Sequence, residues 1–160
     1  MRLAFLALVL TATATQAQAP SQRLTAASAQ AIVSGCAAHA AGRKQSHAIA
    51  VTDTGGHLVA ALRMDGNAQG MMEFAIAKAR AAASWGFGTE QMGEAVRSTP
   101  GFAAAPYVVT VAGGVPVFSA DGTARLGAVG ASGEAPADDA ACAVAGIAAA
   151  GLRAAPGPAS

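Results

Sequence analysis

Two aspartates stand in the stretch VTDTGGHLVAALRMDG, which covers residues 51–66. Asp53 follows one apolar run and Asp65 follows the next, with a glycine turn between the runs. Two carboxylates within reach of one substrate would support general acid and base catalysis. A hairpin returns its second strand to the start of the first, however, so these two carboxylates are expected at opposite ends of the pair. Asp53 therefore has two interpretations, an acceptor for the backbone N–H groups of its own turn or a pocket residue.

Three cations around this hairpin could meet an anion. Lys78 lies in the run AIAKARAAASW, where it could pair with a carboxylate or form part of the solvated face of a helix. Arg63 and Arg80 have the same two interpretations, and a guanidinium binds a carboxylate through two parallel hydrogen bonds.

The elements that must position these side chains follow from hydrophobic periodicity and turn residues. Helices are expected over residues 24–41, 71–85 and 136–152, with a shorter one starting near residue 89; strands are expected over residues 48–52, 57–64, 107–111, 115–119 and 125–132. Thr25 and Thr89 are the predicted N-caps, and Pro136 opens the closing helix. Consecutive strands without alternating helices indicate an antiparallel sheet of the α+β class.

The ends of the chain predict export. Residues 1–19 combine Arg2, a short apolar run and small residues before Ala19, the pattern of a secretory signal peptide, although cleavage after Ala17 stays open. Residues 20–152 then form one domain, and the Pro/Ala/Gly-rich residues 153–160 are expected to be a disordered tail. The run is too short for a membrane span, so we expect a periplasmic or secreted protein with no membrane anchor after cleavage.

Charge and cysteine content add two expectations. The formal net charge of +1 supplies no basic surface, so nucleic acid is not an expected partner. Cys36 and Cys142 are an even pair in an exported chain, which favours one disulfide; two buried thiols are the alternative. Cys36 shares a helix face with Ile32, and small residues around Cys142, such as Gly146, would permit the close approach that a disulfide needs.

Four phrases in the same order and spacing resemble the GlcG/HbpS family of small haem-binding or haem-degrading domains. They are VTDTGGHLVAALRMDG, AIAKARAAASWG, AGGVPVF, and LGAVGASG followed by DDAACAVAGIAAAGL. The resemblance covers roughly residues 24–152. It implies a profilin-like antiparallel sheet of about five strands, flanked by N- and C-terminal helices and a central helical pair. It also implies a homo-oligomer, a haem or other tetrapyrrole ligand, and terminal helices side by side, as the disulfide requires.

The resemblance also suggests where haem would be held. In some members a threonine is proposed near the iron, and Thr110 is the loose candidate here. Histidine is the commoner iron ligand. His39 shares the Cys36 face near a helix C-terminus, where ligand and structural roles both stay open. His57 follows a turn and His47 precedes a strand, so neither is favoured.

Three functions remain open at this point. The first is an exported binding protein for haem or a related small molecule, with Arg63 or Lys78 at the propionates. The second is an enzyme acting on a small organic substrate, using Asp53, Asp65 or Lys78 as acid or base. The third is an oligomeric scaffold without a ligand. Convergence of charged groups around a cavity would favour the enzyme over the binding protein.

Overall fold

The structure, a computed structural model, describes residues 22–158, so the predicted signal peptide lies outside the described residues. The elements are α1 (Ala26–Gly42), β1 (Ala48–Asp53), β2 (Leu58–Arg63), α2 (Gln69–Trp85), α3 (Thr89–Ser98), a short 3₁₀ turn η1 (Phe102–Ala104), β3 (Gly114–Phe118), β4 (Arg125–Ser132) and α4 (Pro136–Ala149). No helix within residues 22–158 is long and apolar enough to cross a membrane.

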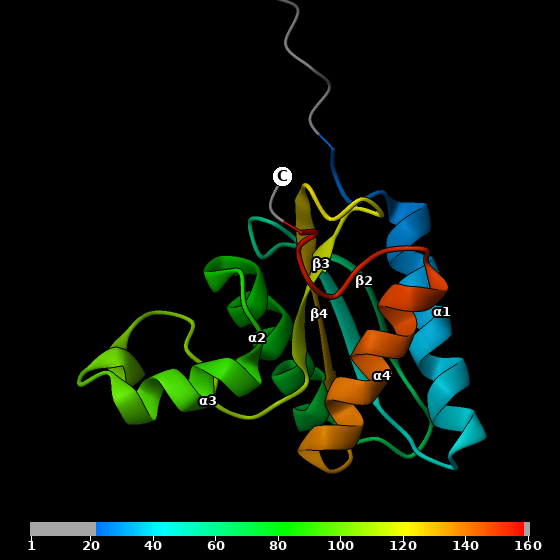
Figure 1. The fold of residues 1–160 in the computed structure, drawn as a ribbon. Helices are drawn as coiled ribbons and strands as arrows, with labels where there is room; N and C mark the ends of the chain where they lie inside the picture. Colours follow the sequence, from blue (N-terminus) through cyan, green and yellow to red (C-terminus); the bar gives the residue numbers. More distant parts are fainter. Residues whose placement is uncertain (1–21, 159–160) are drawn as a thin grey trace, which may run out of the picture.

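One antiparallel sheet with the strand order β2-β1-β4-β3 organises these elements. Helices α1 and α4 lie side by side on one face of the sheet, α2 covers the other face, and α3 extends away from the body (Figure 1). Alternation along β1 sends Ile49 and Val51 toward the α1/α4 core and Ala48 and Ala50 toward α2. The α+β class is confirmed.

The sheet has four strands in the described chain, not about five, because residues 107–111 form no strand. Pro106 has no N–H to donate, and Tyr107 has a φ of 60°, which bends the chain out of an extended conformation. The outer edge of β3 is met by Arg153, whose N–H and C=O both hydrogen-bond to the backbone of Phe118. The expected frayed tail is therefore ordered at its start, and Gly157 also donates to the Gly122 carbonyl.

One of the two predicted N-caps is confirmed. The hydroxyl of Thr25 accepts a hydrogen bond from the N–H of Ser28 and caps α1. Gly88, not Thr89, occupies the N-cap of α3. The Thr89 hydroxyl instead accepts from the N–H of Gly114 at 2.9 Å and joins α3 to the start of β3, a tertiary contact that local capping patterns do not predict.

A disulfide joins Cys36 on α1 to Cys142 on α4, with 4.7 Å between the Cα atoms. Both cysteines are fully buried, as the predicted faces require. The bond ties the first helix to the last and confirms the predicted pairing.

Candidate ligand-binding cleft

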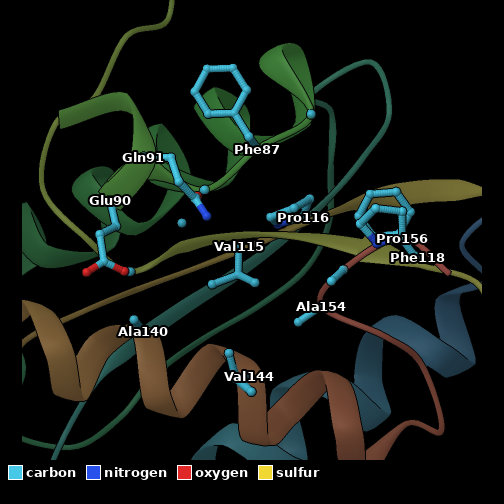
Figure 2. A pocket seen from close by; sticks show the side chains of 15 residues that line it. Phe87, Glu90, Gln91, Val115, Pro116, Phe118, Ala140, Val144, Ala154 and Pro156 are labelled. Carbon is cyan, nitrogen blue, oxygen red and sulfur yellow. The ribbon is translucent and has the colours of Figure 1, made fainter. Parts of the chain in front are cut away.

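An open cleft of about 310 Å³ lies along the edge strand β3. Side chains of β3 form its floor, α4 lies on one side, and the segment joining α2 to α3 lies on the other (Figure 2). The C-terminal segment closes one end beside Phe118. The lining residues are Gly86, Phe87, Gly88, Glu90, Gln91, Gly113, Gly114, Val115, Pro116, Phe118, Ala140, Val144, Ala154, Ala155 and Pro156.

Local backbone features shape the cleft walls. Gly86 adopts the left-handed conformation, with φ of 79°, and ends α2, so the chain turns at Phe87 before α3 begins. The hydrogen bonds of Arg153 to Phe118 hold residues 154–156 against the end of β3. Wall and floor are thus set by contacts between segments that are distant in the sequence.

The cleft surface is mainly apolar. Val115 and Pro116 lie on β3, Val144 projects from α4, and Phe87 lies on the opposite wall with its ring directed away from β3 (Figure 2). Val144 is 45% exposed, although it is a valine in the middle of a helix. Glu90 and Gln91, in the first turn of α3, are the lining residues with polar side chains. Apolar walls with few polar groups are typical of small-molecule sites.

A buried charged cluster lies behind one end of the cleft. The Lys78 ammonium donates to Asp139 at 2.8 Å and to the Ala131 carbonyl at 3.0 Å. His47 Nδ1 lies 3.0 Å from the other carboxylate oxygen of Asp139. A Cβ at Gly113, a lining residue, would lie 2.8 Å from the Lys78 Nζ, so the cleft end and the cluster share a wall.

The cluster decides between the two interpretations of Lys78, pairing with a carboxylate or exposure on a solvated helix face. The lysine is 1% exposed and pairs with a carboxylate of the protein, so it does not lie on a solvated helix face. Local sequence patterns do not show that His47 and Asp139 are buried with Lys78, because His47 precedes β1, Lys78 lies on α2 and Asp139 lies on α4. One signal in the sequence points to the buried role of Asp139. Asp138 alone would supply a negative charge at the N-terminus of the closing helix, so a second aspartate at the start of an apolar run calls for another partner.

Asp53 and Asp65 lie at opposite ends of the hairpin, since Ala48 pairs with Arg63 and Thr52 with Leu58. Asp53 Oδ1 accepts from the N–H groups of Gly55 and His57, each at 2.9 Å. The pKa of Asp53 lies below its ordinary value of 3.8, chiefly because the His57 N–H donates to the charged carboxylate. Its observed contacts are those of a turn acceptor.

The predicted site residues are not brought together. His39 is half-buried on α1, Thr110 is exposed in the segment before β3, and Arg63 donates to the Asn67 carbonyl at the far edge of the sheet. None of His39, Asp53, Arg63, Asp65, Lys78 and Thr110 lines the cleft.

A second hollow contains one of these residues. It measures about 390 Å³, and Asp53, Arg23 and Arg125 are its charged lining residues. Arg125 also lies against Gly86, because a Cβ on that glycine would meet the guanidinium. Within residues 22–158, no group of three His, Cys, Asp or Glu side chains could hold a metal ion.

The fold and the cleft define a small α+β domain with an apolar cleft at a sheet edge. The model of the haem-degrading HbpS-like family matches residues 24–148, and the chain belongs to that family. No curated protein matches the chain.

Solved structures share the fold. A double mutant of HbpS from Streptomyces reticuli has 26% identity and a TM-score of 0.75, with 89% of this chain and 97% of that chain covered. The Klebsiella pneumoniae protein ORFY has 24% identity and a TM-score of 0.75, with coverages of 87% and 97%. A PduOC structure described as a haem complex has 21% identity and a TM-score of 0.75, with coverages of 84% and 99%.

Proposed function

We propose that this protein binds haem or a related tetrapyrrole in the cleft along β3. The observation that carries the proposal is the mainly apolar lining of that cleft, to which β3, α4 and the segment between α2 and α3 contribute. Burying such surface against a flat apolar ring is favourable, at about 25 cal/mol per Å². Membership of the haem-degrading family and the fold shared with the PduOC haem complex support the same ligand class.

The lining of the cleft suits the apolar ring of haem, but it offers no usual ligand for the iron. Val115 and Val144 offer carbon surface to a macrocycle, and a volume of about 310 Å³ would cover part of one. When bound, haem would supply redox chemistry at its iron. The lining residues hold and orient the ring and exclude water from one of its faces.

Charge at the rim would orient the ligand. The Glu90 carboxylate points into one end of the cleft (Figure 2) and would repel ligand carboxylates. Arg125 lies against the cleft residue Gly86 and forms no ion pair with any residue from 22 to 158. The propionates of a bound tetrapyrrole would therefore face away from Glu90 and toward the Gly86 end.

The arrangement of charges favours a binding protein over an acid–base enzyme. Asp53 is occupied by its own turn, Asp65 is at the far end of the hairpin, and Lys78 is buried against Asp139. A general acid or base must reach a bound substrate, and these three side chains do not converge on the cleft.

A haemin titration of the mature protein, followed by its Soret band, tests the proposal. Val144→Glu places a charge on the cleft wall and should lower haemin affinity at least about tenfold. Ala141→Glu introduces the same charge on an exposed position of the same helix that does not line the cleft, and should leave the affinity unchanged. Equal loss in both variants, or no binding by the wild type, would contradict the proposal.

We also propose export and self-association. Cleavage within residues 17–20 during expression in a Gram-negative host tests the signal peptide; an uncleaved cytoplasmic chain would contradict it.

The proposed self-association rests on β2, an edge strand that exposes Leu58 and Leu62. Such a surface favours pairing with another chain. Leu62→Lys should lower the mass seen by light scattering, whereas Val111→Lys should not.

A further inference from the structure

The lining of the cleft separates recognition of a ring from ligation of its metal. Proteins hold haem iron with histidine, cysteine, methionine or tyrosine side chains. The 15 residues that line the cleft include none of these four types (Figure 2). Their polar side chains are the carboxylate of Glu90 and the amide of Gln91, neither of which is a usual ligand of haem iron.

Residues of the four types near the cleft are committed elsewhere. Both cysteines are in the disulfide, so neither offers a thiolate. His47 is fully buried with its Nδ1 at the Asp139 carboxylate, and Met92, on the helix that carries Glu90, is fully buried. None of these side chains lines the cleft.

We infer that the cleft selects planar tetrapyrroles by their ring and not by their metal. This inference rests on the proposed function and deepens it. The binding free energy comes from contact with the apolar lining of the cleft, such as Val115 and Val144. A porphyrin presents the same faces to these side chains with or without iron. Metal-free porphyrin should therefore bind as tightly as haemin, and bound haemin should keep an iron face open to small ligands.

Parallel titrations with haemin and protoporphyrin IX test the inference. Quenching of Trp85, the single tryptophan of the chain, reports binding of both. We expect dissociation constants within about threefold of each other, and we expect Val144→Glu to weaken both to the same extent relative to Ala141→Glu. Added imidazole should shift the Soret band of bound haemin without releasing it, because no protein side chain competes for the iron.

Two outcomes would overturn the inference, and they differ in meaning. Haemin that binds about thirtyfold more tightly than protoporphyrin IX, with a Soret band that imidazole does not shift, would mean that the protein ligates the iron; the proposed function would then stand. Binding of neither ligand would overturn the proposed function, and the inference with it. Glu90→Gln tests whether the Glu90 carboxylate ligates the iron. If the ratio of the haemin and protoporphyrin IX dissociation constants stays unchanged in this variant, the inference is supported; a change of about tenfold in that ratio contradicts it.

Discussion

Gly146 on α4 lies against the backbone of Ile32 on α1, so closely that a Cβ at position 146 would stand 2.4 Å from the Ile32 carbonyl oxygen. Gly35 makes the reciprocal contact, because its Cβ would stand 2.4 Å from the Ala149 Cβ. Glycines on both helices thus let the two backbones approach, and this approach brings Cys36 and Cys142 within bonding distance.

Gly146→Ala should destabilise the protein by about 1–3 kcal/mol. The added methyl group must push the helices apart, and this cost outweighs the gain in helix propensity. Gly42→Ala is the matched control, since nothing lies within 4 Å of its Cβ position at the end of α1; it should be neutral or slightly stabilising. Urea unfolding of both variants measures the difference, and equal effects would show that the helix contact is not tight.

Loss of the disulfide should lower the melting temperature by ~10–20 °C without abolishing the fold. The bond spans a sequence separation of 106 residues, and the chain-entropy model assigns such a loop roughly 4–5 kcal/mol. The double variant Cys36→Ser, Cys142→Ser and the reduced wild type should behave alike in calorimetry. Thiol counting on denatured, unreduced protein is the direct check, and two free thiols per chain would refute the pairing.

Asp139→Asn should cost about 3–5 kcal/mol, because it leaves the buried Lys78 ammonium without a counterion. Asp138→Asn is the adjacent control. Asp138 pairs with the exposed Arg43 at 3.3 Å on the surface, and such pairs contribute at most about 1 kcal/mol. Both changes remove one negative charge from the first turn of α4, so the effect on the helix dipole cancels. Similar unfolding midpoints in urea would contradict the importance of the buried pair.

Asp53→Asn should destabilise the protein near neutral pH by no more than about 1 kcal/mol, because the carboxylate is 43% exposed. The pKa of Asp53 in the folded protein is lowered, so its contribution to stability is complete above 3.8 and disappears as the pH falls through the folded value. The difference in urea midpoint between wild type and variant should therefore be largest at neutral pH and should shrink as the pH is lowered through the folded pKa of Asp53. Asp65→Asn, which changes a carboxylate outside the turn, is the matched control for the loss of one negative charge.

Local patterns predicted much of the fold. Helical periodicity and capping residues identified α1, α2 and α4, and glycine turns identified the β1–β2 hairpin. The face shared by Ile32 and Cys36 predicted that Cys36 is buried. These features depend on neighbours within a few residues, or on one face of one helix, and the sequence displays both directly.

The run YVVTV, residues 107–111, shows where local propensity fails. Its residues favour strands, yet a strand needs a partner. The free edge of β3 is taken by Arg153, and Tyr107 turns the chain away. Thr89 is a similar case, because its hydroxyl serves Gly114 across the fold and not its own helix.

The sequence by itself determined the α+β class, the helices, the hairpin and the family, and it favoured a disulfide that the structure confirms. Tertiary structure alone decided that Lys78 is buried with Asp139 and that the six predicted site residues lie apart. It also decided that an apolar cleft forms from β3, α4, the start of α3 and the C-terminal segment. The physical reason is that burial and cavities depend on which distant segments pack together, and hydrophobic periodicity reports which face of an element is buried but not what covers it.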